Sequence, residues 1–187
     1  SSETSEPSSS SSSSESSSTG TDLGEGEVQT YYYQPNQGDF NGIGYEAKAG
    51  TTDLINGLAW NFDAFAFLGQ SSDGIQIGSN KYPQKTPWTL ETTFPGEVKL
   101  LGYTLALKTT VGAHYKVEAG SYLHEEDIPG NAAVVEYSAD GLEEATTSFA
   151  LSLSANSKAV YFYSITLSLF VPDSLDLDLV GKDEELV

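Results

Sequence analysis

Apolar and polar residues alternate along residues 157–172, and this alternation predicts a long β-strand. One row of alternate positions is apolar: Ala159, Tyr161, Tyr163, Ile165, Leu167, Leu169 and Val171. The other row, from Val160 to Phe170, has serine and threonine in its middle. A period of two in β-branched and aromatic residues is typical of a strand with one buried face. Proline cannot donate to a sheet ladder, so Pro172 ends the strand, which we place at the centre of an antiparallel sheet.

Shorter segments with strand-like composition follow one another along most of the chain. Strands are expected at 31–33, 75–77, 88–94, 98–108, 115–119, 133–137 and 148–153. Pro95 and Gly96 predict a turn between two of these strands, and Gly102 predicts a β-bulge. Turn residues at 140–141 predict a connection between two others. Residues 120–131 are polar, and we expect them to form a loop.

The apolar segment 54–68 fits either a helix or a strand by its length. Its aromatic content and the turn-forming pair Asn56–Gly57 favour a strand. Trp60 lies in the most apolar part of this segment, so we expect it in the core.

The spacing of about eight or nine such segments, with no amphipathic helix between them, predicts an all-β fold. We expect a jelly-roll-like antiparallel β-sandwich over residues 28–172. Residues 1–27 are rich in serine and acidic residues and lack apolar surface, which predicts a disordered linker. The acidic tail, residues 173–187, either adds a strand or begins a further linker, and its last residues are expected to be solvated.

Acidic residues dominate the charge of the chain, with 27 Asp and Glu against eight Lys and no Arg, a formal net charge of −19. This balance argues against binding to nucleic acid or to anionic lipid, both of which need a basic surface. We interpret the acidity as a source of solubility, with divalent-cation binding as the alternative. The absence of cysteine excludes disulfides and thiolate metal sites. No apolar run is long enough to predict an integral membrane span.

Four segments resemble a module of surface lipoproteins and secreted enzymes of Gram-positive bacteria: IQIGS at 75–79, WTLETTF at 88–94, VKLLGYTL at 98–105 and KAVYFYSITLSL at 158–169. The resemblance implies a jelly-roll or galactose-binding-like sandwich, often an accessory domain beside a catalytic one. The chain departs from the family pattern at Phe162 and Tyr163, where a basic residue is common. No functional residue is transferred from the family.

The serine tract also resembles the spacer of bacterial lipoproteins, in which such a tract follows a lipid-bearing cysteine. We therefore expect an extracellular or cell-surface protein, with a lipid anchor on a removed N-terminal cysteine as one form of attachment. A linker between two domains explains the tract equally well.

The residues that carry catalysis in known enzymes form no recognisable set here, so we expect no enzymatic activity. His114 and His124 lie in different segments and would form a pair only if their strands were neighbours. Glu143 and Glu144 are adjacent, and adjacent residues on a strand point to opposite faces. The sequence shows neither a phosphate-binding loop nor a nucleophile motif.

His124, Glu125, Glu126 and Asp127 form the densest cluster of candidate metal ligands. Hard oxygen donors suit calcium, which is the only cofactor that we consider. The spaced Asp, Asn and Gly pattern of a dedicated calcium loop is absent from this segment.

Carbohydrate binding needs flat aromatic faces and neighbouring polar groups. Tyr82 and Trp88 flank the proline-containing loop 80–87, and Tyr122 lies in the predicted loop 120–131, so these three are the candidate ligand-binding residues. The sequence therefore predicts a non-catalytic extracellular module that binds a glycan. The alternative is a structural or adhesive surface protein that binds another protein; the pattern indicates no oligomeric state.

Overall fold

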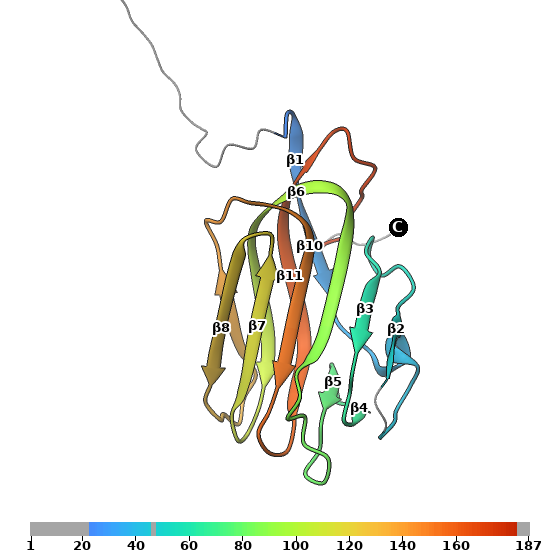
Figure 1. Ribbon diagram of the computed structural model, residues 1–187, viewed down its shortest axis with the longest axis vertical. Helices are drawn as coiled ribbons and strands as arrows, with labels where there is room; N and C mark the ends of the chain where they lie inside the picture. The colour runs from blue at the N-terminus through green and yellow to red at the C-terminus, as the bar shows by residue number, and fades with distance from the viewer. Residues whose placement is uncertain (1–22, 46–47, 183–187) are drawn as a thin grey trace, which may run out of the picture.

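The computed structural model describes residues 23–45 and 48–182, and this part of the chain is built almost entirely from antiparallel strands (Figure 1). The elements are β1 (Gly26–Tyr33), the 3₁₀ helix η2 (Gln37–Phe40), β2 (Ala49–Thr51), β3 (Trp60–Asp63), β4 (Leu68–Gln70), β5 (Ile75–Ile77), β6 (Trp88–Lys108), β7 (Ala113–Ala119), β8 (Tyr122–Ile128), β9 (Val135–Ala139), β10 (Glu144–Ser154) and β11 (Val160–Pro172). Within the described ranges, no helix is long and apolar enough to cross a membrane. The all-β fold class is confirmed.

All the strands belong to one continuous hydrogen-bonded sheet, which folds over into two layers. The first layer has the order β2, β3, first half of β6, β10, β7, β8. The second layer has the order β9, second half of β6, β11, and then β1 and β5, which pair with successive parts of one edge of β11. β4 lies beyond β5. The predicted sandwich therefore forms, and β6 belongs to both of its layers.

The turn predicted at Pro95–Gly96 is wrong, because β6 runs unbroken from Trp88 to Lys108. Thr93 pairs with Ser148 and Val98 with Thr146, so residues 94–97 lie opposite Thr147 alone. Pro95 falls in this irregular stretch, where its missing N–H breaks no ladder bond, and the strand can change layers there. The bulge predicted at Gly102 is confirmed, since Gly102 and Leu100 pair with consecutive residues of β11.

β11 is the predicted central strand, with β6 on one edge and β1 and β5 on the other. The single apolar row predicted along it is wrong at its start. A register shift between Phe162 and Ser164 inserts one extra residue, and such a bulge exchanges the two faces of a strand. Val160 and Phe162 therefore face the core together with Ile165 and the alternate residues that follow, whereas Tyr161 and Tyr163 are half-buried.

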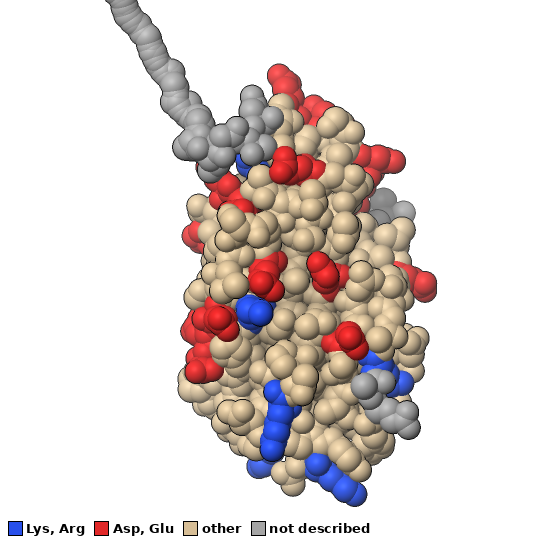
Figure 2. All heavy atoms as spheres, viewed as in Figure 1, with Lys and Arg blue, Asp and Glu red and all other residues tan. Residues whose placement is uncertain are grey.

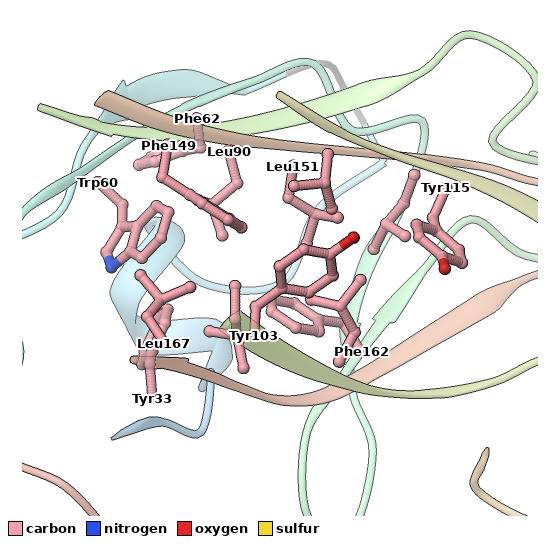
Figure 3. Close-up of a cluster of buried hydrophobic side chains, with 14 of the residues drawn as sticks. Tyr33, Trp60, Phe62, Leu90, Tyr103, Tyr115, Phe149, Leu151, Phe162 and Leu167 are labelled. Atoms are coloured by element: carbon pink, nitrogen blue, oxygen red, sulfur yellow. The ribbon is translucent and has the colours of Figure 1, made fainter. Parts of the chain in front are cut away.

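Aromatic side chains from both layers fill the core (Figure 3). Trp60 is completely buried, as expected, and its Nε1 donates a hydrogen bond to the Tyr31 hydroxyl at 2.8 Å. The apolar segment 54–68 is not one strand: β3 ends at Asp63, and Phe65 enters the core from the loop that follows. Figure 3 shows Trp60 and Phe149 of the first layer opposite Leu167 of the second.

The loop predicted at 120–131 is wrong, because β8 occupies Tyr122–Ile128 and pairs along its whole length with β7. Its five central residues are all exposed. Charged side chains on both faces are common on an edge strand, where they discourage pairing with another chain. Without an apolar face, β8 lacks the alternation from which strands are predicted.

Both ends of the described chain differ from the predicted boundaries. β1 begins at Gly26, so Gly26 and Glu27 are paired to β11 and are not part of a linker. Residues 173–182 continue along β1: Leu177 and Leu179 are buried, and Val180 accepts a hydrogen bond from the Tyr32 amide at 3.0 Å. The rest of the predicted serine-rich linker, residues 1–22, and the predicted solvated residues 183–187 lie outside the described residues.

Replacing Trp60 with alanine tests the core. The change removes a fully buried ring and leaves the Tyr31 hydroxyl without its partner. We expect the free energy of unfolding, measured by urea denaturation, to fall by about 3–5 kcal/mol. Leu54→Ala is the control, because Leu54 is 75% exposed, and we expect a change below about 0.5 kcal/mol. Equal, small losses in the two variants would show that Trp60 is not in the core.

Candidate functional site

The edge strands of the two layers, β8 and β9, border a groove of about 440 Å³. Its lining is rich in tyrosine: Tyr103, Tyr115, Tyr122, His124, Glu126, Glu136, Tyr137, Ser138 and Ala139. We call this the tyrosine groove. Its volume lies within the range of about 300–1,000 Å³ that is usual for small-molecule sites.

Strand periodicity explains how the groove is assembled. Tyr122, His124 and Glu126 occupy alternate positions of β8 and therefore project on one side of it. β9 contributes Tyr137 from the opposite layer. Tyr103 of β6 and Tyr115 of β7 are almost completely buried and form the floor. Four strands thus contribute one tyrosine each.

Hydrogen bonds fix the polar atoms of the groove. The hydroxyls of Tyr103 and Tyr122 lie 2.9 Å apart. Glu126 Oε1 accepts a hydrogen bond from the Tyr115 hydroxyl at 3.0 Å and lies 3.1 Å from His124 Nε2. These contacts hold the four aromatic rings and the Glu126 carboxylate in place before any ligand arrives, which lowers the entropy lost on binding.

The protonation states follow from these contacts. Hydrogen bonds from His124 and then from Tyr115 lower the pKa of Glu126, so this group is a carboxylate at neutral pH. Burial raises the pKa of Tyr103 and of Tyr115, so both hydroxyls stay protonated. The groove consequently offers neutral hydroxyls together with a negatively charged acceptor.

The aromatic rings form a partly continuous surface. The ring of Tyr115 lies 5.5 Å from that of Tyr137 and 5.8 Å from that of His124. The ring centres of Tyr103 and Tyr122 lie 6.1 Å apart, with an angle of 69° between the ring planes. Tyr122 and Tyr137 are half-buried, so each presents part of its ring to solvent.

The three sequence-predicted ligand residues do not meet. Tyr122 lines the tyrosine groove, from a strand instead of a loop. The prediction that Trp88 binds the ligand is wrong, because Trp88 is fully buried. It packs against Phe65, with the ring centres 4.7 Å apart. It occupies the first inward position of β6, where alternation directs it to the core.

Tyr82 belongs to a separate surface patch. It is 39% exposed, and its ring lies 5.5 Å from that of Tyr45, which is 62% exposed. Phe67 completes the patch, 4.8 Å from Tyr45. None of these residues lines the tyrosine groove.

The four predicted metal ligands are divided between the two faces of β8. His124 and Glu126 line the groove, whereas Glu125 and Asp127 contact His114 on the other face. The four side chains therefore do not converge on one ion, and the two histidines form no pair. Across the described ranges, no group of three or more His, Cys, Asp or Glu is arranged to hold a metal ion. Calcium binding by this chain stays a prediction.

Sequence reasoning missed Tyr103, Tyr115, Tyr137 and Glu136. Tyr103 and Tyr115 occur in predicted strands and were indistinguishable from core residues. The available signal was the set of tyrosines on separate strands, but their convergence depends on which edges of the two layers meet.

Comparisons with known proteins give distant similarities only. No protein-family model and no curated protein matches the sequence, so the resemblance to the Gram-positive module stays a prediction. Among solved structures, a family two carbohydrate esterase from Cellvibrio japonicus is 12% identical with a TM-score of 0.38; the match covers 78% of this chain but only 36% of the esterase.

Two smaller structures are matched over most of their length. The C-terminal CBM6 of LamC, a marine laminarinase from Zobellia galactanivorans, is 12% identical with a TM-score of 0.42, over 75% of this chain and 99% of that one. CBM29_1, a family 29 carbohydrate binding module from Piromyces equi, is 8% identical with a TM-score of 0.41, over 85% and 95%. At these identities and TM-scores, function has to be inferred from the chain's own residues.

His114 provides a pH-dependent contact between β7 and β8. Its Nδ1 lies 2.7 Å from Asp127 and its Nε2 2.8 Å from Glu125. The hydrogen bond with Asp127, and then that with Glu125, raises the pKa of His114 above its ordinary value of 6.5. Protonated His114 therefore stabilises the folded state fully below about pH 6.5, and the contribution is lost as the pH rises through the folded-state pKa.

We expect His114→Gln to lower the melting temperature more at pH 5.5 than at pH 9. Since the ring is partly exposed to solvent, the effect at pH 5.5 should be small, about 1–3 °C. Differential scanning calorimetry at both pH values measures it. Lys116→Gln on the same strand is the control, because it makes a comparable replacement at a residue that pairs with Glu118 instead of with Asp127. A loss that is the same at both pH values would contradict the assignment.

Proposed function

We propose that this chain is a non-catalytic carbohydrate-binding module, and that a neutral glycan binds in the tyrosine groove. The proposal rests on one observation: four strands place tyrosines along one groove together with the carboxylate of Glu126. A sugar ring has apolar C–H faces and a rim of hydroxyls. The aromatic faces suit the first feature and the fixed hydroxyls and carboxylate suit the second.

The charges in the groove favour a neutral sugar. The Glu126 carboxylate lines it, Glu136 borders it, and no lysine is among its lining residues. A uronate or sulfated sugar would meet like charges there, which is destabilising. Neutral hydroxyls, in contrast, donate readily to carboxylates in charge-assisted hydrogen bonds.

The state of Glu126 supports binding instead of hydrolysis. A glycoside hydrolase needs one carboxyl group whose pKa is raised, so that it can protonate the leaving oxygen. The pKa of Glu126 is lowered by its hydrogen bonds with His124 and Tyr115. Glu126 is therefore suited to accept hydrogen bonds from a ligand and poorly suited to act as a general acid.

The cellular setting follows from the proposed ligand and from the composition of residues 1–20. Glycan polymers are presented outside the cytoplasm, and a serine-rich tract of this kind is typical of spacers that hold a binding domain away from its attachment point. We propose that the module acts at the cell surface or in the extracellular space, tethered through this tract.

Removing one wall of the groove tests the proposal. A glycan array of neutral oligosaccharides identifies a ligand, and isothermal titration calorimetry then compares variants. We expect Tyr137→Ala to weaken binding about tenfold or more, because an aromatic contact of this kind contributes about 0.5–1.5 kcal/mol beyond its buried area. Glu126→Gln should also weaken it, since it replaces a charged acceptor with a neutral one.

Tyr32→Ala is the matched control, because Tyr32 is a half-buried tyrosine on β1 that does not line the groove. Wild-type affinity in both groove variants would contradict the proposal. Binding to an isolated surface protein, with no glycan bound on the array, would favour an adhesive protein in its place.

A further inference from the structure

The loops at one end of the sandwich contain lysine and no acidic residue. The loops 78–87, 109–112, 129–134 and 155–159 contain Lys81, Lys85 and Lys158 and no Asp or Glu, in a chain with 27 acidic residues. Lys108 ends β6 beside them. Hydrogen bonds connect these loops. The Asn131 amide donates to Thr109 O and the Ala155 amide to Gln84 O, each at 2.7 Å. The Thr109 hydroxyl donates to Ala159 O at 3.2 Å. We call this region the lysine end.

The distribution of charge is visible on the molecular surface. Figure 2 shows lysines gathered at the lower end of the face in view, where the β5–β6 and β10–β11 loops lie in Figure 1. Acidic side chains are scattered over the upper and middle parts of the same face, with few lysines among them. An anionic ligand is therefore repelled by most of the surface and attracted to one end.

A pocket of about 300 Å³ opens at the lysine end. It is lined by Gln76, Asn80, Thr110, Lys158, Ala159 and Tyr161. The Nζ of Lys108 lies 5.7 Å from the centre of the Tyr161 ring. The pocket lining thus has one ammonium group, one aromatic ring, two amide side chains and a hydroxyl, with no carboxylate, and a second ammonium group, that of Lys108, lies over the aromatic ring.

The backbone holds this pocket in a fixed shape. Lys158 has φ +59°, in the left-handed region that residues other than Gly and Asn adopt infrequently. The Lys158 carbonyl packs against Gly78, where an added Cβ would lie 3.0 Å from it. Buried Gln84 fixes the neighbouring loop, 78–87. Its side chain makes hydrogen bonds with Ala64 O at 2.9 Å and Ala66 N at 2.6 Å. A preorganised loop loses less entropy when a ligand binds.

We propose that the lysine end is a second binding site, which takes an anionic sugar. The carboxylate or sulfate group lies between Lys108 and Lys158, and the sugar ring lies against Tyr161. Lysine is a compact positive charge that pairs with either group, so the shared chemistry is a negative charge on a sugar ring. The inference rests on the proposed function only for the choice of a sugar as the carrier of that charge.

Titration with tri-galacturonate, followed by calorimetry and by amide NMR shifts, tests the site. We expect binding to the wild-type protein, with shifts centred on residues 76–80, 108–110 and 158–161. Lys158→Gln and Lys108→Gln should each weaken it about tenfold or more, the usual effect of losing one hydrogen bond to a charged group. Lys116→Gln is the control, because Lys116 pairs with Glu118 at 3.8 Å on another surface and should change nothing.

Two further probes separate the possible sources of the charge. The fully methyl-esterified trisaccharide has the same shape without the charge, and we expect it not to bind at the lysine end. Galactose 6-sulfate should bind and lose affinity in Lys158→Gln. Equal binding of inorganic sulfate and galactose 6-sulfate would overturn the sugar part of the proposal, and so would binding to anionic lipid vesicles without binding to any anionic sugar.

Failure of this site and failure of the tyrosine groove give different results. If tri-galacturonate binding survives in Tyr137→Ala and is lost in Lys158→Gln, the lysine end stands whatever the groove binds. If it is lost in Tyr137→Ala and retained in Lys158→Gln, the second site is wrong and the groove accounts for all binding. No binding of either anionic sugar also overturns the inference.

Discussion

One strand shared between two layers is the constraint on which the rest of this structure depends. The first half of β6 pairs with β3 and β10, and its second half pairs with β9 and β11. β10 in turn carries β7 and β8, so the position of every edge strand is linked to β6. The tyrosine groove exists because β9 pairs with the second half of β6 whereas β8 is linked to the first half through β7 and β10, with Tyr103 of β6 on the groove floor.

This arrangement places two kinds of polar chemistry on separate parts of a rigid body. The carboxylate of Glu126 belongs to edge strand β8 and lines the tyrosine groove, and Glu136 of edge strand β9 borders it. The lysine end is made of loops that connect strands of the two layers, and buried Gln84 fixes one of them. Because rigid strands hold the two regions apart, a neutral and an anionic ligand would not compete for the same contacts. A net charge of −19 strengthens the contrast between the lysine end and the remaining surface.

The alternation of apolar and polar residues was sufficient to predict most strands and the fold class, because a strand with one buried face has a strict period of two. It failed where another constraint decided the structure. Pro95 lies in a strand because the ladder is already interrupted there, and β8 has no apolar face because it is an edge. Trp88 looked accessible beside a proline loop, yet the first inward position of β6 buries it. The groove was invisible for a different reason: its tyrosines lie on four strands, and those of β7 and β8 meet those of β6 and β9 only because β6 pairs in both layers.

Nuclear Overhauser contacts along β6 test this account most directly. The structure predicts that Thr92 is close to both Trp60 and Phe149, and that Tyr103 is close to both Ala139 and Leu167, within one molecule. Observation of both sets would establish that one unbroken strand joins the two layers. Contacts between residues 88–94 and 98–104 across a turn at Pro95–Gly96, in place of either set, would contradict it.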